Sequence, residues 1–168
     1  MKRSFLILIA FLCLINVTRA QCTLTKTTIG ATIKVETNEG YFYIRQATSY
    51  HAVALKGVKL TGTTGSKTSL QIKFTTTSST FKPQLMHIKF ADGSMIMDVL
   101  KFKKKGKTDK KEFIENTYEI ALSVDDLNRL SLLPIQSIAL SSKIKVNSIE
   151  IPVSDGSLFQ QQIICLKN

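Results

Sequence analysis

Short runs in which apolar and polar residues alternate dominate this sequence, and they constrain the fold more than any other feature. Residues 31–36, 70–74 and 118–122 all alternate in this way. A period of two residues places every second side chain on the same side of a β-strand, so these runs predict strands with one buried face. No strand–helix–strand repetition accompanies them, which argues against a parallel α/β sheet.

Turn residues separate the predicted strands. Residues 38–40 indicate a turn into an aromatic strand over residues 41–45, and the alternation slips by one residue at Gly57, which indicates a β-bulge. The clearest turn is Asp92-Gly93, because an Asp-Gly pair adopts the backbone conformation of a tight hairpin. The alternating apolar residues beside it are Met86, Ile88 and Phe90 before the turn and Met95, Met97 and Val99 after it.

Two segments have helical spacing instead. Ser123 and Asp126 have the spacing of a capping box, and Pro134 limits the helix that begins there. We interpret Asp125 and Asp126 as helix-start residues rather than a catalytic acid pair, because acids there interact favourably with the helix dipole. The apolar spacing of residues 159–166 predicts a C-terminal helix. The fold is therefore predicted to be mainly β, an antiparallel β-sandwich or a partly open barrel with one short internal helix and this C-terminal helix.

The first 20 residues have the layout of a cleavable signal peptide. Lys2 and Arg3 give a cationic start, and the apolar run over residues 5–15 is too short to span a bilayer. Ala20 is a small residue after which a signal peptidase can cut. The terminal position favours a signal over a buried core helix. We expect an exported protein, periplasmic or secreted, whose residues 21–168 form a single β-rich domain.

Two cysteines remain once the signal is removed, since Cys13 lies within it. Cys22 and Cys165 form an even pair, which in an oxidising compartment predicts one disulfide between the two ends of the domain. Two buried free thiols are the alternative. Lipidation of Cys22 is not expected, because Arg19 and Gln21 are a poor match to the small or apolar residues that precede a lipid-acceptor cysteine.

The chain is basic, with 23 Lys and Arg against 12 Asp and Glu, a net charge of +11 that falls to +8 without the signal. The densest group of lysines comprises Lys101, Lys103, Lys104, Lys105, Lys107, Lys110 and Lys111. One interpretation is a solvated loop over residues 101–111. The other is a contact site for an anionic partner, since clustered lysines attract phosphate or sulfate groups. An exported protein meets little nucleic acid, so we expect anionic envelope polysaccharide, lipid headgroups or another envelope protein instead.

Tyr41, Tyr43 and Arg45 share one face of a predicted strand. A stripe of aromatic rings can stack on sugar rings, and Arg45 can pair with a carboxylate or sulfate. The alternative is that Phe42 and Ile44 are core residues and the tyrosines only cover the sheet. The absence of Trp favours this alternative, because sugar-binding platforms usually draw on Trp.

No motif for catalysis or metal binding stands out. The two histidines, His51 and His87, have no metal-ligand spacing, and no phosphate-binding loop or nucleophile elbow is present. We predict no catalytic, metal or cofactor-binding residue and no membrane-spanning segment in the mature chain. The leading hypothesis is a non-enzymatic secreted or envelope-associated binding module. The alternatives are a hydrolase, with His51 or a carboxylate in a cleft beside a second titratable group, and a carrier of a small apolar ligand with a large cavity.

A hairpin, a strand-to-helix cap and a returning strand follow one another in the second half of the chain. They comprise residues 88–94, 118–122, 125–127 and 134–138, with Cys165 near the end. Over roughly residues 85–166 this order resembles small uncharacterised exported proteins of Bacteroides-type bacteria. The resemblance implies a secreted β-rich domain of unknown role and no catalytic residue.

Overall fold

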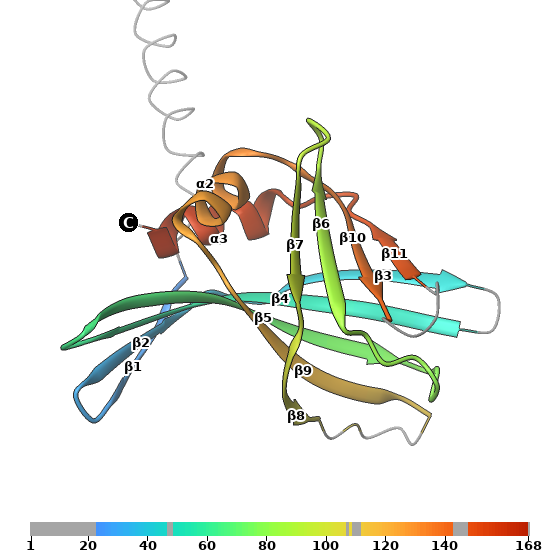
Figure 1. Cartoon of the computed structure of the whole chain (residues 1–168), viewed down its shortest axis with the longest axis horizontal. Coiled ribbons are helices and arrows are strands. Elements are labelled where there is room, and N and C mark those ends of the chain that lie inside the picture. The colour runs from blue at the N-terminus through green and yellow to red at the C-terminus, as the bar shows by residue number, and fades with distance from the viewer. Residues whose placement is uncertain (1–22, 47–48, 107, 109–111, 143–147, 168) are drawn as a thin grey trace, which may run out of the picture.

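The described part of the chain folds into two antiparallel β-sheets and two helices (Figure 1), which confirms the predicted mainly β, sandwich-like fold. The computed structural model describes residues 23–46, 49–106, 108, 112–142 and 148–167. The predicted signal peptide lies outside these residues. Export, cleavage after Ala20 and a single domain over residues 21–168 therefore stay predictions.

The larger sheet is built around two long neighbouring strands. Its strands in spatial order are β1 (Thr25–Ile29), β2 (Thr32–Glu36), β4 (Ser49–Gly62), β5 (Gly65–Thr76), β9 (Ile114–Ala121) and β8 (Lys101–Lys105), and β3 (Gly40–Gln46) also pairs with β4. Strand β4 pairs with β3 along its first half and with β2 along its second half. At the end that pairs with β2, the seven-stranded sheet extends beyond the smaller sheet (Figure 1).

The smaller sheet crosses the larger one at a steep angle (Figure 1). Its strands in spatial order are β11 (Ser148–Pro152), β10 (Ile135–Ser141), β6 (Leu85–Phe90) and β7 (Met95–Val99). The chain passes from β7 in this sheet to β8 in the other through the buried Leu100, as strands do at the corners of orthogonally packed sheets. Among the described strands no ladder joins β3 to β11, so the barrel is not closed.

The core lies between the two sheets, and the predicted alternation supplies most of it. The large, fully buried side chains include Leu55, Leu70, Ile72, Phe74 and Ile120 from the larger sheet and Met86, Ile88, Phe90, Ile138, Leu140 and Ile151 from the smaller one. Burying one such side chain stabilises the fold by about 1.5–3 kcal/mol. This packing makes the central part of the larger sheet a rigid platform for its opposite face.

The Asp92-Gly93 hairpin forms as predicted, but its second strand has the opposite phase to the one its methionines indicate. Gly93 adopts a positive φ of 84°, and Asp92 accepts a hydrogen bond from the backbone N–H of Ser94 at 2.9 Å. The register pairs Ile88 with Ile96, so Ile96 faces the core. The apolar residues that point outward instead are Met95, Met97 and Val99.

The β-bulge predicted at Gly57 is wrong, because β4 and β5 pair without interruption through this residue. Gly57 instead marks the place where the pairing partner of β4 changes from β3 to β2. Thr37 binds both backbone groups of Gly57. Thr37 Oγ1 accepts from the N–H of Gly57 at 2.9 Å, and the backbone N–H of Thr37 donates to the Gly57 carbonyl at 3.0 Å. A Cβ at this position would lie 2.7 Å from Leu166, so glycine permits the close approach of a helix.

Two helices pack on one another and cover the end of the core (Figure 1). Helix α2 (Val124–Leu132) begins with the predicted capping box, in which Ser123 Oγ accepts from Asp126 N–H and Asp126 Oδ2 accepts from Ser123 N–H, both at 3.1 Å. Helix α3 (Ser157–Lys167) buries Phe159, Ile163 and Leu166 and packs against β4. Both helical predictions are confirmed.

Candidate functional site

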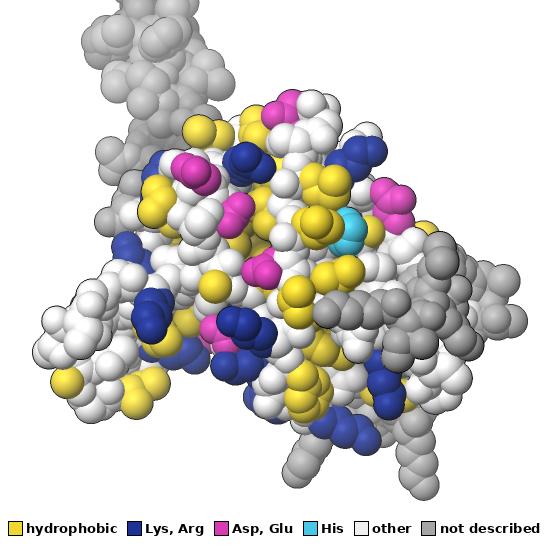
Figure 2. Space-filling model, viewed as in Figure 1, with side chains coloured by type: hydrophobic (Ala, Val, Ile, Leu, Met, Phe, Trp, Pro, Cys, Tyr) yellow, Lys and Arg dark blue, Asp and Glu magenta, His cyan; other side chains and the backbone are white. Residues whose placement is uncertain are grey.

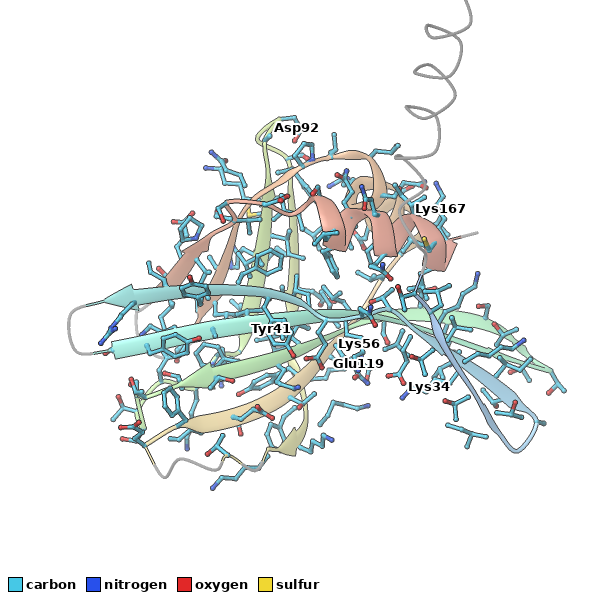
Figure 3. The ribbon with its side chains drawn as sticks, turned by 180° about the vertical axis from the view of Figure 1, so that it is seen from behind. Lys34, Tyr41, Lys56, Asp92, Glu119 and Lys167 are labelled. Atoms are coloured by element: carbon cyan, nitrogen blue, oxygen red, sulfur yellow. The ribbon has the colours of Figure 1, made fainter. Side chains whose placement is uncertain are left out.

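The face of the seven-stranded sheet that points away from the smaller sheet, here called the outer face, brings the predicted contact residues together. Residues that pair across an antiparallel ladder point to the same side. The pairs Tyr41–Ala54 and Ala54–Lys73 therefore place Tyr41 and Lys73 on one face, opposite the buried Phe42 and Val53. Figure 3 shows Tyr41, Lys56 and Glu119 close together midway along the sheet.

One end of the outer face carries a pocket that we call the aromatic pocket. It is lined by Tyr43, Arg45, Ser49, Tyr50, Thr77, Glu112 and Phe113. Its volume of about 450 Å³ falls within the range of ligand pockets, about 300–1,000 Å³. Three aromatic rings, one guanidinium, one carboxylate and the aliphatic hydroxyls of Ser49 and Thr77 surround the same space. This mixture of apolar and polar groups suits a ligand with an apolar face and a polar edge.

The rings of this pocket hold one another in place. The Tyr43 and Tyr50 rings stack at 6.3 Å with an interplanar angle of 24°, and Phe113 meets Tyr50 edge-on at 5.6 Å and 84°. Thr77 fixes the backbone of Tyr50 from both sides, because Thr77 Oγ1 accepts from Tyr50 N–H at 3.0 Å and Thr77 N–H donates to the Tyr50 carbonyl at 3.1 Å. Tyr43 is nevertheless 68 % exposed, so its ring is supported and also accessible.

Tyr41 does not join this pocket, although the sequence groups it with Tyr43 and Arg45. It lies on the same face but belongs to a charged network in the middle of the sheet. Its hydroxyl donates to Glu39, and Lys73 Nζ donates to both oxygens of that carboxylate, at 3.1 and 3.2 Å. Lys56 adds a longer ion pair with Glu39 at 3.7 Å. The predicted three-residue stacking face is thus divided between two neighbouring sites.

The charged network keeps its groups ionised. Burial raises the pKa of Glu39, but hydrogen bonds from Tyr41 and Lys73 outweigh it, and the pKa lies below its ordinary value. Burial lowers the pKa of Lys73, but its bond to Glu39 outweighs that effect, and the pKa lies above its ordinary value. Both shifts move away from neutral pH, so this arrangement suits electrostatic contact better than proton transfer.

The lysine run is only in part the loop that the sequence indicates. Its first four lysines lie on the edge strand β8, whose pairing with β9 shifts register between Phe102 and Lys104. Lys107, Lys110 and Lys111 lie outside the described residues. The loop prediction is therefore wrong for residues 101–105, where backbone pairing with β9 holds a segment that is exposed on both faces.

The lysines of β8 differ in their partners. Lys103 pairs with Glu119 at 2.6 Å. Burial raises the pKa of Glu119, but its hydrogen bonds with Lys103 and Ser69 outweigh burial, and the pKa lies below its ordinary value. Lys104 opens onto a cavity of about 210 Å³ that it shares with Lys56 and Lys73. The lining thus combines three lysines, from β8, β4 and β5, with the Glu39 carboxylate that pairs with Lys56 and Lys73.

His51, a candidate for a hydrolytic site, is a core residue. It is buried, its Nδ1 lies 2.9 Å from Thr76 Oγ1, and its ring stacks on Phe74 at 6.2 Å. Burial lowers the pKa of His51. In the described part of the chain no titratable side chain hydrogen-bonds to it, and no three His, Cys, Asp or Glu residues there are grouped for a metal ion.

Only one cysteine of the predicted disulfide lies within the described residues. Cys165 lies on α3, whereas Cys22 lies outside the described residues. The bond between them stays a prediction.

A second exposed feature lies along β7 and the start of β8. Figure 2 shows hydrophobic side chains gathered over β7 and the start of β8. They belong to Met95, Met97, Val99 and Phe102, of which Met97 is 64 % exposed. Arg129 covers part of this edge by donating to the Met95 carbonyl at 3.2 Å.

Sequence reasoning missed Tyr50, Phe113 and the polar rim of the aromatic pocket. The pairing of Arg45 with Tyr50 follows from the hairpin of β3 and β4 and was within reach of a sequence argument. The approach of Phe113 depends on β9 lying beside β5, which no local pattern reveals.

No family model, curated protein or solved structure matches this chain. None of the helices in the described residues is long and apolar enough to cross a membrane.

Proposed function

We propose that this chain is an exported, non-enzymatic binding module of the cell envelope or its surroundings, and that it binds an anionic polysaccharide through the outer face. The signal-like N-terminus and the resemblance to exported β-rich proteins support the compartment. The charge of the outer face supports the partner, because fixed positive groups attract sulfate and carboxylate groups.

The observation that carries the proposal is the position of the β8 lysines. Because they lie on a paired strand, their spacing is set by the sheet rather than by a loop. Lys103 is matched by Glu119, whereas Lys104 shares its cavity with Lys56, Lys73 and the Glu39 carboxylate that pairs with both of them, so three positive charges face one negative charge. An anionic group bound at this cavity would offset the positive charge that Glu39 leaves unbalanced.

The same lysines also protect the edge of the sheet. Lysines on an edge strand hinder pairing with another chain, and this alone accounts for part of their number. Edge protection predicts no preference for a ligand, whereas the proposed function predicts salt-dependent binding that depends on these positions.

The test is chromatography of the exported form of the protein on an immobilised sulfated polysaccharide, with neutral dextran as the reference matrix. We expect retention on the sulfated matrix that weakens with salt. The triple variant Lys101→Gln, Lys104→Gln, Lys105→Gln should bind about tenfold more weakly. The matched control neutralises the exposed Lys26, Lys82 and Lys89, which lie away from the outer face, and should keep the original affinity.

Equal weakening in both triple variants would show that only net charge matters and would contradict the proposal. Absence of binding to sulfated and to carboxylated polysaccharides would contradict it as well.

A further inference from the structure

We infer that the aromatic pocket binds one ring of an acidic saccharide, with the ring stacked on Tyr43 and its carboxylate or sulfate paired with Arg45. This inference deepens the proposed function and rests on it for the anionic character of the ligand. It adds a defined site and a defined contact for the sugar ring, at the end of the outer face opposite to the β1–β2 hairpin.

The first argument is the accessible, supported ring of Tyr43. Stacking on Tyr50 holds one side of the ring, and Tyr50 is itself fixed by Phe113 and by the two backbone bonds with Thr77. With 68 % of its surface exposed, Tyr43 offers a flat apolar surface to a ligand. A preorganised ring loses little conformational freedom on binding, which favours affinity.

The second argument is the position of Arg45. It follows Tyr43 on the same face of β3 and lines the same pocket. Within the described part of the chain, no acidic side chain forms an ion pair with it. A guanidinium donates two parallel hydrogen bonds to a carboxylate or sulfate, and these contacts set the orientation of a bound ring.

The third argument is the polar rim. The hydroxyls of Ser49 and Thr77 and the carboxylate of Glu112 lie around the same space. Sugar hydroxyls donate to carboxylates and exchange hydrogen bonds with Ser and Thr. Glu112 also repels a second negative charge, so the pocket favours a ring with a single acidic group placed toward Arg45.

The pocket and the lysine cavity complement each other on one surface. They lie at different positions along the same strands: Tyr50 of β4 lines the pocket, whereas Lys56 of β4 and Lys73 of β5 line the cavity, and all three point to the same side of the sheet. A polysaccharide with repeated negative charges can place one ring in the aromatic pocket while its next acidic groups approach Lys73 and Lys104.

The closing experiment titrates the exported form of the protein with short, soluble oligosaccharides by calorimetry and by NMR of the tyrosine ring protons. The ligands are a trimer of galacturonic acid, a sulfated trimer and a neutral trimer of galactose. We expect binding of an acidic trimer with shifts at the Tyr43 ring; the two acidic arms show whether Arg45 prefers carboxylate or sulfate. The neutral trimer should bind about tenfold more weakly.

Variants within the pocket test the roles of its residues. Tyr43→Ala should weaken binding of the acidic trimer about tenfold, and Tyr43→Phe, which keeps the ring, should restore most of the affinity. Arg45→Gln should remove the preference for the acidic trimer over the neutral one. The control is Phe102→Ala, since Phe102 is an aromatic residue of β8 that is 60 % exposed but lies outside the pocket. It should leave the affinity for the trimer unchanged.

Equal binding of the neutral and acidic trimers, equal effects of Tyr43→Ala and Phe102→Ala, or binding of a short acidic peptide in preference to all trimers would overturn this inference. Polysaccharide retention that depends on the β8 lysines, without trimer binding at Tyr43, would leave the proposed function standing and remove the subsite. Trimer binding at Tyr43 with no effect of the β8 variant on polysaccharide retention would keep the subsite and contradict the proposed role of the β8 lysines.

Discussion

Strands β4 and β5 run through two regions of the molecule. The same backbone ladder pairs the two strands in both regions, but the burial of their side chains differs. In the packed region, residues 49–56 and 71–76, the inward side chains Val53, Leu55, Ile72 and Phe74 are fully buried under the smaller sheet. In the flange, residues 58–69 together with β1 and β2, the same strands extend beyond that cover (Figure 1). Strand β1 is exposed along its whole length.

The difference shows that strand pairing alone does not make a core. The ladder between β4 and β5 continues from Ala52 to Gly62 without a change of register, yet within these two strands the flange is buried only at Val58 and Ser69, next to its boundary with the packed region. A backbone hydrogen bond adds only about 0.5–1.5 kcal/mol net, so the second layer supplies most of the stability. The boundary lies at Gly57, where α3 takes the place of the smaller sheet.

The largest difference in stability between the two regions is expected when a cavity is made in the packed region. Phe74→Ala should lower the free energy of unfolding by about 3–5 kcal/mol, because the ring is fully buried and contacts His51 and Phe81. Leu60→Ala in the flange, where the side chain is 37 % exposed, should cost much less, below about 1.5 kcal/mol. Urea unfolding of both variants measures the difference, and similar losses would mean that the flange has a core of its own.

A smaller effect is expected at the boundary between the two regions. Gly57→Ala places a methyl group 2.7 Å from Leu166 and 2.9 Å from Ile163, both buried on α3, and should destabilise the fold by about 1–3 kcal/mol. Gly62→Ala on the same strand meets only Thr32 Oγ1 at 3.4 Å, and its stability should change by less than about 0.5 kcal/mol. Thermal unfolding separates the two cases; a neutral Gly57→Ala would show that α3 can move away at little cost.

The smallest effect concerns the Glu39 carboxylate on the outer face, which pairs with Lys56 and Lys73 of the packed region. The pKa of Glu39 lies below its ordinary 4.5, because the bonds from Tyr41 and Lys73 outweigh burial, so the folded state binds fewer protons than the unfolded state near this pH. The stability from Glu39 is therefore present above pH 4.5 and lost as the pH falls through the folded pKa. Glu39→Gln should cost less than about 1 kcal/mol at pH 7 and next to nothing in strong acid.

The measurement for Glu39 is urea unfolding of wild type and variant from pH 7 to pH 2.5. Glu112→Gln, which removes an exposed carboxylate outside the charged network, serves as the control and should leave the pH profile unchanged. A constant difference between wild type and Glu39→Gln at every pH would contradict the assignment.

The sequence predicted the elements whose two faces differ. Residues 70–74 and 86–90 alternate because one face meets the core, and the cap at Ser123 and Asp126 acts over only three residues. Prediction failed where this contrast is missing or misleading. Strand β8 is exposed on both faces, so its lysines do not alternate, and the methionines of β7 imitate an inward face on the outer side of an edge strand.

The candidate site divides in the same way. Tyr43 and Arg45 lie two residues apart on a strand, which suffices to place them on one face. Tyr50 requires the pairing of β3 with β4, and Phe113 requires in addition the order of strands in the sheet.

By itself, the sequence determined the mainly β class, the inward faces of the central strands, both helices and the shared face of the tyrosines and Arg45. Each of these follows from a local period or a local hydrogen bond. Tertiary structure alone decided that β4 changes its pairing partner at Gly57, that Tyr41 and Tyr43 belong to different sites, and that Lys104 lines the same cavity as Lys56, Lys73 and Glu39. These depend on contacts between residues far apart in the chain, and a period of two residues states which side of a strand a residue is on but not which strand lies next to it.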